Sequence, residues 1–389
     1  MSEDLFETLI DRNNSGAVKW DNLLQIYGDK ELLPMWVADM DFPSPAAVQE
    51  ALMNRVKHPL YGYTGTAPSV YTAIQDWIKY RHQWEVRKNW ITFSPGVVTA
   101  LSTVIQACTE PGDKILLQSP VYTPFFDLIK SNERVVVNSQ LTIENGRFEI
   151  DFIDLEAKLK NGVKLFLLCS PHNPGGRVWT EEELTKIGDL CAAHGVTIVS
   201  DEIHADLYIE PAKHRPLAAL DQRYANITIT CMAPSKTFNI AGLQASILIT
   251  SNTELQDKIS LVNRRNGFHG LNLIGLTAME AAYKDGAEWL ENLMTYIKKN
   301  VEIAIDFINK EIPGVSPMYP NASYLLWLDC RQLGLTDEEL RTRLIKEGRL
   351  ALEPGPKYGP GGEGFVRMNI GCPRSILMDG LERLKKAFA

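Results

Sequence analysis

The sequence predicts an α/β protein, with a large domain built on a mostly parallel sheet covered by helices and a smaller α+β domain. Three observations support this prediction. The chain has 389 residues, which is more than one hydrophobic core usually serves. From about residue 95, short apolar runs alternate with amphipathic segments, which is typical of strand–helix–strand units. After about residue 310, the order of strands and helices changes.

Four apolar runs are predicted to be buried strands, because each is too short for a helix and ends in turn residues. They are KILLQ at 114–118, VKLFLLC at 163–169, VTIVS at 196–200 and ITITC at 227–231. The segment between the second and third runs is predicted to be a helix. It opens with a capping box from Thr180 to Glu183 and closes at Gly195.

The C-terminal part of the chain is predicted to form the smaller domain. A long helix over 287–310 carries apolar residues at steps of three or four, which makes one apolar face. That face consists of Trp289, Leu293, Ile297, Val301, Ala304 and Ile308. Strands at 323–329 and 365–371 then flank a capped helix at 336–348.

The domain limits follow from this change of pattern. Residues 1–48 are predicted to be irregular, because prolines in MWVADMDFPSP block regular structure. We expect the large domain to cover 49–284. The small domain is expected to combine 1–48 with 285–389.

Composition limits the partners. The net charge of −8 argues against nucleic acid, because phosphate binding needs a basic surface. No apolar run approaches the ~20 residues that span a bilayer, so no membrane association is expected. The acidic start, MSEDLFETLIDRNN, lacks the features of a secretory signal, and the six cysteines form no CxxC pair, so we expect a cytoplasmic protein. The seven histidines lack metal-ligand spacing, and no metal is expected.

Polar side chains follow each predicted strand at its carboxyl end. The residues are Tyr122 in SPVYTPF, Asn173 in SPHNPGG, Asp201 and His204 in DEIHADL, and Ser235 and Lys236 in MAPSKTF. Ligands of doubly wound sheets bind at this edge. Taken singly, each residue is typical of a turn or a solvated strand end. A fifth element, SPGVVTAL, is a glycine turn that enters a helix near Gly96 and leaves backbone N–H groups free for a phosphate.

Together these groups describe one ligand. It has a carbonyl for the Lys236 amine, an aromatic ring for Tyr122 to stack on, and a ring nitrogen whose positive charge Asp201 would hold. It also carries a phosphate for the helix N-terminus. Pyridoxal 5′-phosphate (PLP) has all four features, and a lysine Schiff base with an Asp at the pyridine nitrogen is its protein signature.

A second glycine motif is rejected. Gly359, Gly361 and Gly364 match the spacing of the dinucleotide fingerprint GxGxxG. That fingerprint needs a strand before it and a helix after it. Here a proline-rich loop precedes the motif and the predicted strand FVRMNIG follows, so we do not predict dinucleotide binding.

At this point the chain resembles a known family, the fold-type I PLP-dependent enzymes, and within it the carbon–sulfur lyases of the cystathionine β-lyase type. The resemblance covers essentially the whole chain. It is carried, in order, by PMWVADMDF, YGYT, SPGVVTAL, PVYTPF, PHNPGGR, SDEIHADL, APSKTFNIAGLQ and FVRMNIGCPR. WVADMDF and SDEIH are specific to this branch.

The resemblance implies roles for the site residues. Lys236 would hold PLP as a Schiff base and then act as the base at the substrate Cα, and Asp201 would pair with the pyridinium nitrogen. Tyr122 would stack on the ring and assist the leaving group, while Asn173 would bond the phenolic oxygen. The other expected contacts are His204, which stands where related aminotransferases carry a Tyr, Gly96, Val97, Val98 and Ser235 at the phosphate, and Arg367 at the substrate carboxylate.

The resemblance also implies a homodimer with shared active sites, because Tyr61 would reach the phosphate of the partner subunit. The implied reaction is β-elimination of cystathionine or a related sulfur amino acid to pyruvate, ammonia and a thiol. An aminotransferase and a non-catalytic PLP- or partner-binding protein remain alternatives. Gln244 weakens the match to aminotransferases, many of which carry a phosphate-binding Arg eight residues after the Schiff-base lysine.

Overall fold

The computed structural model describes residues 4–388, and its largest sheet within that range has seven strands. Their order is β2-β10-β9-β8-β7-β3-β4, in which only β10 runs antiparallel to its neighbours. The strands are β2 (Ile91–Ser94), β3 (Lys114–Leu117), β4 (Val135–Asn138), β7 (Val163–Cys169), β8 (Thr197–Asp201), β9 (Thr228–Met232) and β10 (Ser246–Ile249). This mostly parallel sheet confirms the predicted fold class.

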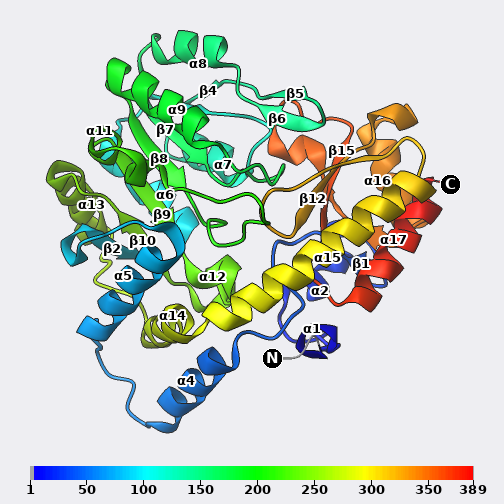
Figure 1. Cartoon of the computed structure of the whole chain (residues 1–389), viewed down its shortest axis with the longest axis horizontal. Coiled ribbons are helices and arrows are strands. Elements are labelled where there is room, and N and C mark those ends of the chain that lie inside the picture. Colours follow the sequence, from blue (N-terminus) through cyan, green and yellow to red (C-terminus); the bar gives the residue numbers. More distant parts are fainter. Residues whose placement is uncertain (1–3, 389) are drawn as a thin grey trace.

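Helices cover both faces of this sheet because successive strand residues point to opposite sides. Leu117 and Leu165 pack with α6 (Val97–Cys108), α7 (Pro124–Ser131) and α13 (Thr253–Arg265). Leu116 and Phe166 pack on the other face with α8 (Phe152–Leu159) and α9 (Glu181–His194). At the β2–β10 end, α5 (Pro68–His82) and α14 (Leu273–Asp285) complete the cover. Figure 1 shows these helices around the sheet.

The predicted strands and helices agree with the structure to within a few residues. The four apolar runs correspond to β3, β7, β8 and β9, and α9 has the predicted capping box between Thr180 and Glu183. Three further strands of this sheet, β2, β4 and β10, were not predicted. Neither was the hairpin of β5 (Thr142–Glu144) and β6 (Arg147–Glu149).

The expectation that residues 1–48 are irregular is wrong for part of that segment. It contains the short helices α1 (Asp4–Glu7), α2 (Val18–Asp21) and α3 (Leu23–Tyr27), strand β1 (Leu33–Pro34) and the start of α4 (Ala46–Lys57). Each early helix is too short to show a full amphipathic period, which explains why the pattern was missed. Residues 35–45, which contain the prolines of MWVADMDFPSP, are extended or bent as expected.

A second, antiparallel sheet lies in the C-terminal part, in the order β11-β12-β15-β14. Its strands are β11 (Ser316–Met318), β12 (Leu325–Asp329), β14 (Glu353–Pro354) and β15 (Phe365–Asn369), and α16 (Asp337–Lys346) and α17 (Arg374–Phe388) accompany them. The N-terminal β1 pairs with β13 (Leu350–Ala351), so an N-terminal segment and a C-terminal segment meet here. This pairing supports the predicted small domain, whose limits at 48 and 285 stay a prediction.

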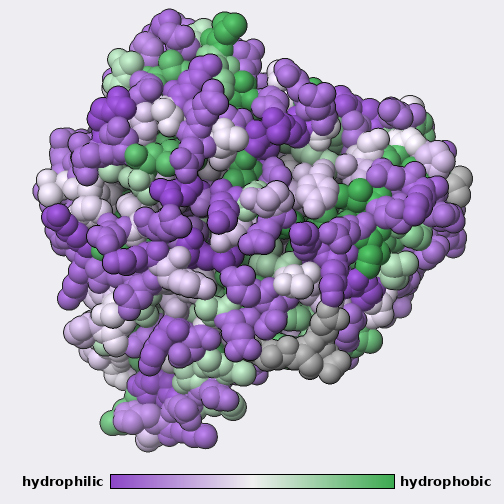
Figure 2. Space-filling view, viewed as in Figure 1, coloured by the Kyte–Doolittle hydropathy of each residue, from purple (hydrophilic) through white to green (hydrophobic). Residues whose placement is uncertain are grey.

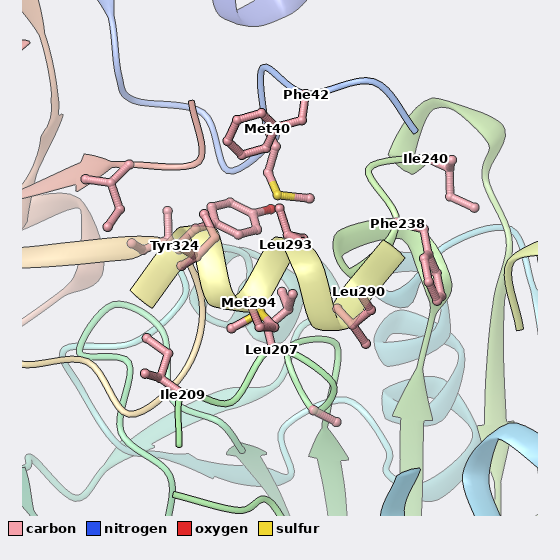
Figure 3. Packing of buried hydrophobic residues seen from close by; sticks show 14 of the residues in the cluster. Met40, Phe42, Leu207, Ile209, Phe238, Ile240, Leu290, Leu293, Met294 and Tyr324 are labelled. Atoms are coloured by element: carbon pink, nitrogen blue, oxygen red, sulfur yellow. The ribbon is translucent and has the colours of Figure 1, made fainter. Parts of the chain in front are cut away.

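The long helix α15 (Ala287–Glu311) runs across the molecule from α14 toward α17 (Figure 1). Its predicted apolar face is buried in full. In Figure 3, Met40 and Phe42 lie on one side of α15 and Leu207 lies on the other. The segment around residues 36–42 is thereby fixed against α15, and it forms one wall of the site described below.

The outer surface is mostly hydrophilic on the face seen in Figure 2. In the part of the chain that the structure describes, no helix has the length and apolar character needed to cross a bilayer. Helix α4 and the segment that follows it project away from the body of the molecule (Figure 1). That projection exposes Leu60, Tyr61 and Tyr63.

Candidate active site

A cavity of about 540 Å³ lies at the carboxyl ends of the parallel strands. Cys169, Asp201 and Cys231 stand side by side in the register of β7, β8 and β9, so the residues just beyond them meet at one edge. All but one of the predicted site residues line this cavity. They are Gly96, Val97, Val98, Tyr122, Asn173, Asp201, His204, Ser235, Lys236 and Arg367.

Lys236 lies in a short helix, α12 (Pro234–Thr237), that begins two residues after β9. Its Nζ donates a hydrogen bond of 2.7 Å to the backbone carbonyl oxygen of Ala38, which also accepts one of 3.0 Å from the Tyr324 hydroxyl. Burial lowers the pKa of Lys236 to about 8. The charge of Arg367 also lowers this pKa, whereas the charges of Asp39 and Asp201 raise it. The amine is therefore partly neutral near physiological pH, which a nucleophilic lysine requires.

Asp201 ends β8 with only 3% of its surface exposed. One carboxylate oxygen accepts the backbone N–H of Ile203 at 3.2 Å. Within residues 4–388, no side chain donates a hydrogen bond to this carboxylate. Burial raises the pKa of Asp201 to about 7, helped by the charge of Glu202 and opposed by the Ile203 N–H and by Lys236. Such a carboxylate is stabilised by a cation that enters the cavity.

Arg367 lies on β15 and is buried beside Asn173. Its Nη1 donates to the Asn173 side-chain oxygen at 3.1 Å, and its Nη2 donates to the carbonyl of Trp36 at 2.7 Å. The buried Nε of Arg367 has no partner among the described residues. A buried guanidinium that lines a cavity and keeps one donor unused is suited to a carboxylate ligand. The bond from Arg367 also leaves the Asn173 amide NH₂ as the group that can donate into the cavity.

His204 and Tyr122 present rings to the cavity in uncharged forms. Burial lowers the pKa of His204 to about 3, and both Lys236 and Arg367 lower it further. Burial raises the pKa of Tyr122 to about 12, with a further increase from Asp201. Neutral rings of this kind can pack against a flat aromatic ligand, and Tyr122 keeps its proton at neutral pH.

The N-terminus of α6 faces the same cavity. Gly96 is the N-cap at φ 150°, and no side chain caps the helix. Positive φ favours glycine at this position. The free N–H groups of the first turn, at Val97 and Val98, have the arrangement that binds phosphate.

Tyr61 is the exception among the predicted residues, because the structure does not bring it to this cavity. It is exposed on the projecting segment after α4, and its hydroxyl donates to the Val56 carbonyl at 2.6 Å. It lines a separate surface hollow with Gly62, Tyr63 and residues 269–274. Its predicted contact with a partner subunit remains a prediction.

Sequence reasoning missed several groups that the structure places in the site. The Ala38 carbonyl holds the Lys236 amine and also accepts from the Tyr324 hydroxyl, and Asp127, Glu353 and Lys357 line the cavity. A backbone carbonyl leaves no trace in a sequence. The motif WVADMDF, which contains Ala38, was noted only as part of the family resemblance.

The donors in this cavity fit PLP. Lys236 offers an amine with a lowered pKa, Asp201 offers a buried carboxylate without a cation, and the α6 N-terminus offers free N–H groups. The cavity volume lies in the usual range for small-molecule sites. These three groups are the partners that the carbonyl, the ring nitrogen and the phosphate of PLP require.

Comparisons with known proteins agree with this geometry. Residues 35–384 match the model of the family described as aminotransferase class I and II. The chain is 50% identical over 385 residues to the cystathionine β-lyase PatB of Bacillus subtilis, covering 99% of this chain and 100% of that protein. Cystalysin of Treponema denticola, solved with PLP, superposes with a TM-score of 0.95 at 36% identity, covering 98% of each chain. A PLP-bound C–S lyase of Staphylococcus hominis gives 0.93 at 33% identity, covering 99% of this chain and 98% of that one.

Proposed function

The chain belongs to the class I and II aminotransferase family, and from this premise we propose that it is a PLP-dependent carbon–sulfur lyase. Its reaction is β-elimination of cystathionine or a related sulfur amino acid, which yields pyruvate, ammonia and a thiol. The observation that carries the proposal is that Lys236 and Asp201 line one cavity, in a chain half identical to a cystathionine β-lyase. PLP, when bound, supplies a carbonyl that amines attack and a ring that accepts electrons from the substrate.

Lys236 has two roles in this proposal. Its amine is the covalent attachment point of the cofactor, and once released it removes the proton from the substrate Cα. Burial favours both roles because it lowers the pKa of Lys236 to about 8, so that a neutral amine is available. The Ala38 carbonyl, 2.7 Å from Nζ, would hold the amine in place whenever it is free.

The other residues hold the cofactor and the substrate and orient them. Asp201 pairs with the ring nitrogen, Asn173 donates to the phenolic oxygen, and Arg367 clamps the substrate α-carboxylate with its unused Nε donor. Tyr122 stacks on the ring, and its hydroxyl, which stays protonated, gives a proton to the departing sulfur. His204, neutral and buried, packs at the same site.

The phosphate is assigned to the α6 N-terminus at Gly96, Val97 and Val98, together with Ser235. We further propose a homodimer in which Tyr61 completes the phosphate site of the partner subunit. The exposure of Tyr61 on a projecting segment supports this arrangement, because a residue buried in its own subunit could not reach across. The cytoplasmic location stays a prediction.

An aminotransferase is the second candidate, because the matching family model carries that name. The two reactions share the residues assigned above, so the site geometry alone does not separate them. They differ in what they require. An aminotransferase needs an oxo acid to accept the amino group, whereas a lyase does not.

Pyruvate release from L-cystathionine by the purified protein, with PLP present and no oxo acid, tests the proposal. We expect many turnovers per active site. The control is Lys236→Ala, which should release no pyruvate and should lose the visible absorption of the lysine-bound cofactor. Turnover that begins only after an oxo acid is added would replace the lyase with an aminotransferase.

A further inference from the structure

Toward solvent, the cavity is lined by charged side chains that the proposed function does not use. The groups assigned above account for the cofactor and for the substrate α-carboxylate. Three further charged side chains line the cavity and have no role in that assignment, namely Asp127, Glu353 and Lys357. Asp127 and Lys357 lie toward solvent, whereas Glu353 is 6% exposed beneath them.

Two backbone elements hold these charges at one rim of the cavity. Lys357 lies in the 3₁₀ helix η4 (Gly355–Tyr358), and Asp127 lies in the first turn of α7. The Thr123 hydroxyl donates to the Lys357 carbonyl at 2.7 Å, and the Val121 N–H donates to the Tyr358 carbonyl at 2.9 Å. Because Asp127 follows Thr123 by one helical turn, both lie on the same side of α7.

Glu353 connects this rim to the carboxylate clamp. It stands opposite Arg367 in the pairing of β14 with β15, and one of its oxygens is 3.9 Å from the Arg367 Nη2. Its other oxygen accepts a hydrogen bond from the Lys357 ammonium. Glu353 therefore takes up part of the charge of Lys357 and anchors its amine over the cavity, while half of the Lys357 side chain stays exposed.

The rim therefore presents a cation and an anion next to the substrate site. Lys357 has further N–H donors beyond its bond to Glu353, and within residues 4–388 the Asp127 carboxylate has no ion-pair or hydrogen-bond partner. An alkyl group that reached this rim would offer no charge to either of these side chains. A group that carries both an ammonium and a carboxylate would meet one complementary charge for each.

We propose that Lys357 and Asp127 form a subsite for the distal end of the substrate, and that this end is itself an amino acid. Lys357 binds the distal carboxylate and Asp127 binds the distal ammonium. The inference rests on the proposed function and narrows it to thioethers that join two amino-acid ends, such as cystathionine. S-alkyl cysteines share the α-carboxylate contact with Arg367 but leave the rim unused.

The test compares two substrates in Lys357→Met and Asp127→Asn. Pyruvate release is measured with L-cystathionine and with S-ethyl-L-cysteine, whose S-alkyl group carries neither an ammonium nor a carboxylate. We expect the ratio of kcat/KM values, cystathionine over S-ethylcysteine, to fall about ten- to a hundredfold in each variant, because one charge-assisted bond is lost. Any loosening of Glu353 and Arg367 changes both substrates together and cancels in this ratio.

Lys160→Met is the matched control. Lys160 forms the same kind of ion pair four residues from its partner, Glu156, at 2.6 Å, and its side chain is similarly exposed. It lies at the end of α8 and does not line the cavity. Its ratio should stay within about twofold of the unmodified enzyme. An unchanged ratio in both Lys357→Met and Asp127→Asn overturns the subsite.

A binding measurement separates this inference from the proposed function. For a protein that does not turn these substrates over, the change in cofactor absorption on adding each one to the holoenzyme gives its dissociation constant. If the unmodified protein releases pyruvate from neither substrate, the lyase proposal fails while the ratio of dissociation constants still decides the subsite. Weaker binding of cystathionine alone in the variants supports it, and equal binding overturns it.

Discussion

Asp201 and Asp206 lie five residues apart in the segment DEIHAD, and they are 3% and 4% exposed, yet their surroundings are opposite. Asp201 faces the cavity with one backbone N–H as its hydrogen-bond donor. Asp206 faces the protein interior and accepts three side-chain bonds, from His82 at 2.9 Å, Thr237 at 2.8 Å and Trp77 at 3.2 Å.

The pKa values follow these surroundings. Burial raises the pKa of Asp201 to about 7. Burial acts in the same direction on Asp206, but the bond and charge of His82 and the nearby Arg81 outweigh it, so the pKa of Asp206 is lowered. The comparison teaches that burial alone does not mark a functional carboxylate. Asp201 is the carboxylate that lacks a paired cation, and a ligand with a positive charge can supply one.

The largest expected effect is on catalysis. Asp201→Asn removes the negative charge that would face the ring nitrogen of the cofactor, so kcat should fall about a hundred- to ten-thousandfold. Steady-state pyruvate release at saturating PLP measures this loss. A loss of less than about tenfold would show that Asp201 is not the partner of the cofactor. It would then contradict the functional distinction between Asp201 and Asp206.

The next effect is on stability. Asp206→Ala leaves the donors of His82, Thr237 and Trp77 without their shared acceptor, so the free energy of unfolding should fall by about 3–5 kcal/mol. Urea unfolding of the holoenzyme measures it. The folded fraction should keep its kcat within about tenfold, in contrast to Asp201→Asn. A large loss of kcat at unchanged stability would assign Asp206 to the reaction instead.

The smallest effect concerns pH and needs the protein without cofactor. The folded pKa of Asp201, about 7, exceeds its ordinary value of 3.8, so its contribution to stability is full below about pH 4 and is lost as pH rises through 7. The Asp201→Asn variant does not lose stability in this way, because its amide does not ionise. Near pH 8 the variant should therefore be more stable than the unmodified apoprotein by roughly 2–4 kcal/mol, with the difference vanishing near pH 4.

Urea midpoints across pH 4–8 measure this difference, and Asp206→Asn is its counterpart. Because the pKa of Asp206 is lowered, its contribution to stability is present above the ordinary range of an Asp and is lost as pH falls. The two variants should therefore depart from the unmodified protein in opposite directions at pH 8. The same direction for both would contradict the distinction between the two carboxylates.

The sequence supported the core of the sheet well, because local apolar runs and one capping box determine β3, β7, β8, β9 and α9. It missed β2, β4 and β10, although the last two also carry short apolar runs, VVV at 135–137 and ILI at 247–249. The strand-end rule located Lys236, Asp201, Asn173 and Tyr122 correctly at one cavity. A local pattern was enough to place these four residues, because each follows the end of a predicted strand.

What the sequence could not supply are contacts between distant segments. Asp206 belongs to the same motif as Asp201, but its donors come from residues 77, 82 and 237, so nothing near it in the chain sets it apart. The Ala38 carbonyl that holds Lys236 is a backbone atom 198 positions away. The charged rim likewise depends on η4 meeting α7 across 234 positions.

The walls of the cavity come from both ends of the chain. Trp36 and Ala38 belong to the N-terminal segment, and their carbonyls contact Arg367 and Lys236. During synthesis, a ribosome completes Lys236, Asp201 and Tyr122 long before it adds Arg367 and the β15 strand that carries it. A nascent chain can therefore form the sheet early, but its cofactor pocket lacks a wall until β15 has been translated. Cofactor capture by the complete site accordingly requires a chain that has been translated through residue 369.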